Sequence, residues 1–161
     1  MRRILPALAA VALTVLSVAP ASAEVWTRRY ELRGRPSVRI VTDDFRVKVH
    51  TRASGPVEFR IEYELHKFGL VRSTPKQPRI EFRQEGDTIS LHAEEPNFIA
   101  FFATVETHST IEVTVPVDAD VSVRTGDGSI ECETLRGSTT LETGDGHIRA
   151  KAQPYTVKQQ G

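Results

Sequence analysis

Apolar and polar residues alternate with period two through most of this chain from residue 38 onwards. Successive side chains of a β-strand point to opposite faces, so each alternating run builds one apolar and one polar face. Beyond the first 23 residues, no convincing stretch has the three- and four-residue spacing of an amphipathic helix. Glycine, proline, aspartate and asparagine separate the runs and are typical of turns. The pattern predicts an all-β fold, with runs at 38–40, 45–50, 57–66, 80–82, 89–93 and 111–115.

The first 23 residues have the three-part layout of a secretory signal. Arg2 and Arg3 precede an apolar run over 4–18, and Ala21-Ser22-Ala23 forms a cleavage site of small residues. The alternative is a transmembrane anchor, but the run is shorter than the roughly 20 residues that a membrane span needs. We therefore expect residues 1–23 to be a cleaved signal peptide and the protein to be exported to the periplasm, the cell surface or the medium.

Charge excludes one class of partner. Loss of Arg2 and Arg3 from 21 basic residues leaves 19, against 21 acidic residues in the chain. A nucleic-acid-binding protein usually needs a basic face, and this balance gives no sign of one. No second apolar run of spanning length follows the signal, so we expect no stable membrane span. The expected partner is an unknown protein or glycan.

A repeat begins near residue 116. Thr125-Gly126-Asp127-Gly128-Ser129-Ile130 recurs 18 residues later as Thr143-Gly144-Asp145-Gly146-His147-Ile148. A fixed period of two short strands is typical of a β-solenoid, whose coils bury their apolar residues against one another. We predict an antiparallel N-terminal β layer within 24–115 and the start of a solenoid over 116–161. The expected inward residues are Val121, Val123, Ile130, Cys132, Leu141 and Ile148.

The stretch from Val115 to Ile130 resembles the DUF4097 family of exported, adhesin-like β-strand-repeat proteins. In that family a Val-Pro strand end leads into repeated Thr-Gly-Asp-Gly-x-Ile coils, and 141–148 matches as well. The resemblance is specific over about 111–150 and loose over 36–110. It implies a β-repeat fold and a surface protein of undefined activity, and it carries no catalytic or ligand residues. Family members have further coils, so we expect either that 151–161 is a cap or, preferably, that the chain is truncated.

Two aspartates are weak metal candidates. Asp127 and Asp145 fall one repeat apart, and calcium favours oxygen ligands. However, the nonapeptide of calcium-binding β-rolls is absent, and Asp-Gly is also a tight-turn dipeptide. We favour the turn and expect no metal or cofactor, with a calcium-dependent stalk as a minor alternative.

Other reactive residues give no catalytic pattern. The histidines lie on polar positions or beside turns, so we expect them at the surface, although distant ones could converge. Cys132 is expected to be a small core residue, because a reactive thiol needs exposure and a lowered pKa. The chain has no nucleophile elbow and no phosphate-binding loop. The histidines are His50, His66, His92, His108 and His147.

We therefore expect a non-enzymatic envelope protein that acts by binding or as a scaffold. The alternative is a carbohydrate-active or other hydrolytic β-helix, which needs acids converging in one cleft. Weak binding candidates are Phe98, Phe101 and Phe102. They lie in a segment in which residues at both odd and even positions are apolar, so that both faces of a strand would be apolar. Such a segment is either an exposed loop that contacts a partner or a membrane surface or, as we prefer, a strand buried on both faces or a loop that closes one end of the core.

Overall fold

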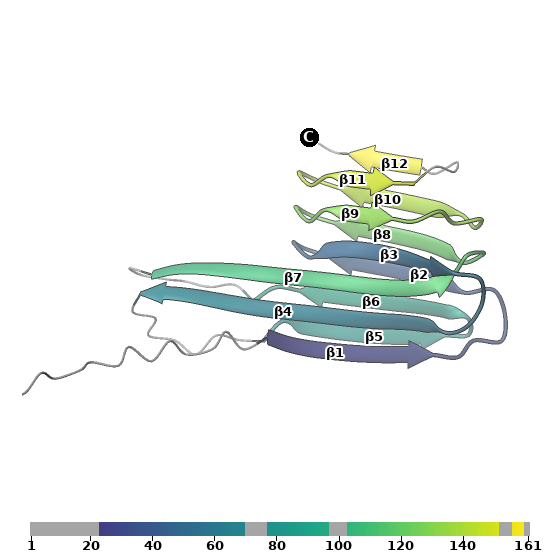
Figure 1. Ribbon diagram of the computed structural model, residues 1–161, viewed down its shortest axis with the longest axis horizontal. Coiled ribbons are helices and arrows are strands. Elements are labelled where there is room, and N and C mark those ends of the chain that lie inside the picture. The colour runs from purple at the N-terminus through teal and green to yellow at the C-terminus, as the bar shows by residue number, and fades with distance from the viewer. Residues whose placement is uncertain (1–22, 70–76, 97–102, 152–155, 160–161) are drawn as a thin grey trace, which may run out of the picture.

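Figure 1 presents the computed structural model of the 161-residue chain, which describes residues 23–69, 77–96, 103–151 and 156–159. Within these ranges the chain forms strands and no helix, which confirms the predicted all-β class. The described part therefore contains no helix that is long and apolar enough to cross a membrane. The predicted signal peptide lies outside these ranges, except for Ala23, which begins the first strand.

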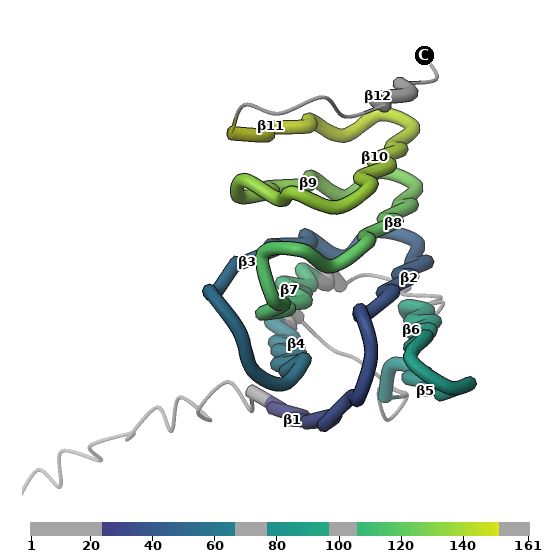
Figure 2. Tube along the Cα trace, turned by 90° about the vertical axis from the view of Figure 1, so that its right-hand side faces the viewer, coloured from purple at the N-terminus to yellow at the C-terminus, as the bar shows by residue number. Residues whose placement is uncertain are grey.

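The strands form two six-stranded sheets that face each other (Figure 2). The first, sheet A, has the order β1-β4-β7-β3-β9-β11. Its β1, β4 and β7 pair antiparallel, whereas β7, β3, β9 and β11 pair in parallel. The bounds are β1 Ala23–Tyr30, β4 Val57–Gly69, β7 Ala103–Pro116, β3 Arg46–Arg52, β9 Ile130–Cys132 and β11 Ile148–Ala150.

The second, sheet B, has the order β12-β10-β8-β2-β6-β5. All its neighbours pair in parallel except β5 and β6, which form an antiparallel pair around the turn at Gly86. The bounds are β12 Thr156–Gln159, β10 Thr139–Thr143, β8 Asp120–Thr125, β2 Ser37–Thr42, β6 Thr88–Glu94 and β5 Arg79–Glu85.

Three segments contribute one strand to each sheet. We call them the first unit (37–52, with β2 and β3), the second unit (120–132, with β8 and β9) and the third unit (139–150, with β10 and β11). The second and third units pair at the predicted 18-residue offset, with Val123 opposite Leu141 and Ile130 opposite Ile148. The first unit lies directly beside the second in both sheets, although β4 to β7 separate them along the chain.

This placement corrects part of the fold prediction. The N-terminal region is not a purely antiparallel layer, because β2 and β3 pair in parallel with β6 and β7 of that region as well as with β8 and β9 of the repeat region. Both sheets are therefore mixed. The antiparallel expectation holds for β1, β4 and β7 and for the β5–β6 pair. The proposed division near residue 116 stays a prediction.

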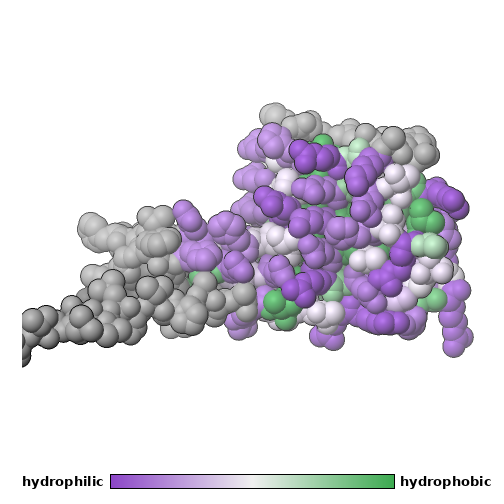
Figure 3. Space-filling view, in the orientation of Figure 1, coloured by the Kyte–Doolittle hydropathy of each residue, from purple (hydrophilic) through white to green (hydrophobic). Residues whose placement is uncertain are grey.

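The inward side chains of both sheets form one apolar core. The predicted inward residues Val121, Val123, Ile130, Cys132 and Leu141 are buried, whereas Ile148 is half-buried. Trp26 and Tyr30 near the start of the described chain pack against this core. The outer face of sheet A, which faces the viewer in Figure 1, is largely hydrophilic (Figure 3). The period-two alternation thus corresponds to a buried and a solvated face on each sheet.

Candidate functional site

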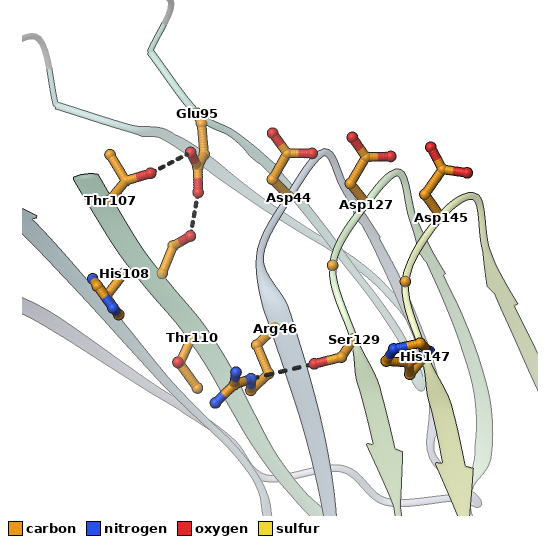
Figure 4. A pocket seen from close by; sticks show the side chains of 13 residues that line it. Asp44, Arg46, Glu95, Thr107, His108, Thr110, Asp127, Ser129, Asp145 and His147 are labelled. Carbon is orange, nitrogen blue, oxygen red and sulfur yellow. Dashed lines mark hydrogen bonds between the residues drawn. The ribbon is translucent and has the colours of Figure 1, made fainter. Parts of the chain in front are cut away.

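An open depression of about 490 Å³ lies at the end of the molecule where the turns of the three units stack. We call it the turn groove. Each turn contributes an aspartate and the residues that follow it, and β7 and Glu95 close the other side (Figure 4). Its lining is mostly polar and charged. The lining residues are Asp44, Arg46, Glu95, Thr107, His108, Ser109, Thr110, Asp127, Gly128, Ser129, Asp145, Gly146 and His147.

The three turns are held together by backbone hydrogen bonds. The N–H of Gly126 donates to the carbonyl of Asp43 at 2.6 Å, and the N–H of Gly144 donates to the carbonyl of Gly126 at 2.7 Å. The buried hydroxyl of Thr125 donates to the Asp43 carbonyl at 2.9 Å, and that of Thr143 donates to the Gly128 carbonyl at 2.9 Å. Each later turn therefore satisfies carbonyl groups of the turn before it.

The stacked turns identify a repeat that sequence reasoning missed. Residues 42–47, Thr-Asp-Asp-Phe-Arg-Val, occupy the places that Thr-Gly-Asp-Gly-x-Ile occupies in the second and third units. The shared Thr-x-Asp spacing, followed three residues later by a β-branched residue, is the signal that could have found it. The glycines that make the later copies conspicuous are absent from the first.

Three aspartates line up along the tips of the turns. Asp44, Asp127 and Asp145 are exposed, and their carboxylates point in a similar direction in Figure 4. Among the residues that the structure describes, no three His, Cys, Asp or Glu side chains are grouped so that they could hold a metal ion. Asp127 and Asp145 both lie between strands, so the turn interpretation accounts for the repeated Asp-Gly pair.

Glu95 is fixed at the opposite side of the groove. Its carboxylate accepts hydrogen bonds from the hydroxyl of Thr107, at 3.1 Å, and from the hydroxyl of Ser109. Tyr63 lies opposite Ser109 in the β4–β7 pair and is buried. Burial raises the pKa of Tyr63 to about 12, and the charges of Glu95 and Glu24 act in the same direction. The groove therefore borders on a buried polar region between the sheets.

Basic and imidazole side chains complete the groove. Arg46 donates from Nε to the hydroxyl of Ser129 at 3.2 Å, and His147 lies beside Ser129 on the neighbouring turn. His108 contacts His66 edge-on, with ring centroids 5.6 Å apart. His66 and His108 are distant in the sequence but lie together in the structure, a possibility that their sequence spacing does not exclude. His92 is exposed and His50 is half-exposed, as expected of surface histidines.

The remaining sequence candidates lie elsewhere. Phe98, Phe101 and Phe102 are outside the described residues. Cys132 is buried, and burial, with a smaller effect of the Glu133 charge, raises the pKa of its thiol to about 11. A thiol in this state is not a good nucleophile at neutral pH, which agrees with the prediction that Cys132 is a core residue.

The groove has the chemistry of a binding surface for a polar ligand. It offers carboxylate and hydroxyl acceptors, hydroxyl and guanidinium donors, and two imidazoles. General acid–base catalysis by paired acids requires two carboxyl groups in contrasting environments. The three turn aspartates share one environment, because they are exposed at equivalent places of successive turns, whereas Glu95 accepts hydrogen bonds from Thr107 and Ser109.

No family model matches the chain, and no curated protein matches it. The solved structures that match include two at low identity. A "putative cell adhesion protein" from Clostridium sporogenes has 8% sequence identity and a TM-score of 0.45, with 86% of this chain and 73% of that chain covered. A "putative adhesin" from Parabacteroides distasonis has 7% identity and a TM-score of 0.33, with 85% and 65% covered. These likenesses are too distant to carry a functional argument.

Proposed function

We propose that this chain is an exported, non-enzymatic envelope or surface protein that acts by binding a protein or glycan or as a scaffold. The signal-like layout of residues 1–23 supports export. The Thr-Gly-Asp-Gly-x-Ile repeat supports membership of the DUF4097 family, whose members resemble adhesins. The proposal assigns the molecule's activity to its polar surfaces.

The proposed architecture behind this function is a short β-solenoid. The first, second and third units each place one strand in each sheet, and their strands pair in parallel. In a stack of this kind, outward-facing positions recur on neighbouring strands about 4.8 Å apart. Such regular faces are the binding surfaces that repeat proteins use.

The turn groove is the observation that carries the proposal. Its side chains come from three stacked turns and from β7, so the fold itself holds donors and acceptors in a fixed row. An open, polar depression suits a ligand rich in hydroxyl or amide groups. No observation favours the hydrolytic or the calcium-dependent alternative over binding.

The first arm of the test concerns export. The complete chain is expressed in a bacterial host, and the intact mass of the protein outside the cytoplasm is measured. Removal of residues 1–23 is the expected result. An unprocessed chain that stays in the cytoplasm overturns the proposal.

The second arm concerns binding. The protein is screened against arrays of glycans and of envelope proteins, and each ligand found is measured again with Arg46→Gln. The matched control is Arg60→Gln, on the same outer face but paired with Glu62. Weaker binding by R46Q but not by R60Q is expected. Cleavage of a glycan by the protein, or binding to nothing on the arrays, contradicts the proposal.

A further inference from the structure

The outer face of sheet B holds a second depression, of about 660 Å³, which we call the β5 hollow. It is formed by β2, β5 and β6, away from the turn groove. Arg39, Glu81, Arg83, Ser90 and His92 line it, together with Phe82. The ring of Phe82 itself packs inward against the core, edge-on to Phe59 at 5.2 Å between centroids. The size is within the range of pockets that bind small molecules or short segments of a polymer.

Two arginines of the hollow lie on either side of one serine. Arg83 of β5 and Arg39 of β2 are both in register with Ser90 of β6. Because neighbouring strands are about 4.8 Å apart, the backbones of the two arginines are about 10 Å apart. Both side chains are exposed, and neither has an acidic partner within the described part of the chain.

Two carboxylates near these arginines are already occupied, and Glu85, two residues from Arg83 on β5, forms no ion pair with it. Glu81, two residues from Arg83 on β5, accepts a hydrogen bond from Nε of Arg79 at 2.6 Å. Asp120, on the strand next to Arg39, accepts from Arg35 at 2.6 Å. The guanidinium groups of Arg39 and Arg83 are therefore available to an outside anion, and their planar forks match a carboxylate.

On the outer face of sheet A, by contrast, a row of charged residues in register across neighbouring strands is balanced in charge. There Arg60, Glu112, Lys48, Glu131 and Arg149 are in register on successive strands, with charges of alternating sign. Lys48 and Glu112 form an ion pair at 3.1 Å. Each charge in that row has an opposite neighbour, so the row leaves little unbalanced charge for a partner.

The row through the β5 hollow instead alternates guanidinium and hydroxyl groups. Arg83, Ser90, Arg39, Ser122 and Thr140 are in register across five strands, and no carboxylate belongs to this row. At about 4.8 Å per strand the row is about 19 Å long. It can therefore contact an extended ligand, with hydroxyl groups next to the cationic groups.

We infer that this row binds a carboxylated polysaccharide, with carboxylates on Arg39 and Arg83 and sugar hydroxyl groups on Ser90, Ser122 and Thr140. The flanking rows contain acids, with Glu81 and Glu142 on one side and Glu85 and Asp120 on the other. A polymer with dense charge, such as a polyphosphate, would be repelled by them. A polymer with one carboxylate per sugar presents hydroxyl groups between its charges and fits the row.

The inference adds a second binding surface, separate from the turn groove, and names its partner class; it rests on the proposed function of binding. Its test uses protein produced from the complete sequence and isothermal titration calorimetry with oligogalacturonate. The comparison ligands are the methyl-esterified form, which has the same sugars without charge, and polyphosphate. Binding of the acid form alone is expected, and it weakens with added salt.

Two variants locate the site, and a third is the control. Arg39→Gln and Arg83→Gln each weaken binding roughly tenfold or more, because each removes a charge-assisted bidentate contact. Arg124→Gln leaves it unchanged, since Arg124 lies on the same face in the neighbouring row and is paired with Glu142 at 3.6 Å. Thermal unfolding of all three checks that the fold is intact.

The negative outcomes separate this inference from the proposed function. Failure to bind oligogalacturonate by a protein that does bind another array ligand overturns the inference alone. Equal binding of polyphosphate, or unchanged affinity in R39Q and R83Q, also overturns it. A protein that binds no ligand of any class contradicts both.

Discussion

A β-carbon added to Gly146 would lie 2.0 Å from the carbonyl oxygen of Gly128. Gly128 has the same relation to Phe45, whose carbonyl oxygen would be 2.1 Å from a β-carbon at Gly128. These contacts are far shorter than two non-bonded atoms allow, and the atoms concerned belong to the backbone. The glycines of the repeat are therefore needed because each turn is packed tightly against the preceding turn.

The first prediction concerns Gly146→Ala. The added methyl group has to push two turns apart, so we expect the free energy of unfolding to fall by about 1–3 kcal/mol. Urea unfolding followed by far-UV circular dichroism measures it. Asp145→Asn is the matched control in the same turn, because Asp145 is exposed, and its effect should stay within about 0.5 kcal/mol. Equal stability of G146A and the parent protein would show that the turns are not packed in this way.

The close packing also explains what could and could not be predicted from the sequence. The second and third units were found because Gly126, Gly128, Gly144 and Gly146 stand in identical patterns. In the first unit Phe45 takes the place of Gly128, and its side chain is fully buried in the core. The backbone of the first unit's turn follows the same path as the later turns with different residues, so the local sequence pattern alone does not reveal it.

Pairing between distant segments was the other feature that local patterns could not supply. Alternation identifies strands, but it does not say that β2 lies beside β8, because β4 to β7 intervene. The same holds for the groove. Asp127 and Asp145 were recognised from their repeat, whereas Asp44, Arg46 and Glu95 join them only through tertiary pairing.

A second prediction compares two buried threonines. The hydroxyl of Thr125 donates to the carbonyls of Asp43, at 2.9 Å, and Phe45, at 3.4 Å. Thr42 holds the equivalent place in the first unit, but its buried hydroxyl has no hydrogen-bond partner in the described part of the chain. Valine has nearly the same shape as threonine without the hydroxyl.

We therefore expect opposite signs for the two substitutions. Thr125→Val should lower the free energy of unfolding by about 0.5–1.5 kcal/mol, because it removes the hydrogen bond of the hydroxyl to the turn of the first unit. Thr42→Val should leave it unchanged or raise it by about 1 kcal/mol, because it removes an unpaired buried polar group. Urea unfolding of both variants under identical conditions is the measurement. A loss of stability in T42V as large as that in T125V would contradict the stabilising role given to the hydrogen bonds of the Thr125 hydroxyl.

A third prediction concerns acid stability. The N–H of Thr51 donates to Oε2 of Glu133 at 2.9 Å, and His50 lies 3.6 Å from Oε1 of the same carboxylate. The hydrogen bond from Thr51, followed by the charge of His50, lowers the pKa of Glu133 below its usual 4.5. A lowered folded-state pKa adds stability that is present above the unfolded value and is lost as pH falls through the folded value.

Glu133→Gln should accordingly flatten the acid side of the stability curve. Thermal midpoints of the variant and the parent are compared at several pH values, from neutral down to about pH 3. The parent should lose more stability than E133Q below 4.5, and the difference between the two should be nearly constant above it. Parallel curves over the whole range would show that the Thr51 contact does not distinguish the two protonation states.

The last prediction concerns the alkaline side and Tyr63. Burial, with the charges of Glu95 and Glu24, raises the pKa of this phenol from 10.0 to about 12. The folded state then holds a proton that the unfolded state releases, so Tyr63 makes stability fall as pH rises from 10.0 towards about 12. Its hydroxyl is also buried without a hydrogen-bond partner among the described residues.

Tyr63→Phe removes both the titrating group and the unpaired hydroxyl. At neutral pH we expect an unchanged or slightly higher unfolding midpoint, because no hydrogen bond is lost. Above pH 10.0 the variant should lose less stability per pH unit than the parent. Urea unfolding at neutral pH and at two values above 10.0 makes the comparison. A marked loss of stability at neutral pH would mean that the hydroxyl has a partner in the folded protein, and an unchanged alkaline slope would mean that Tyr63 is accessible to water.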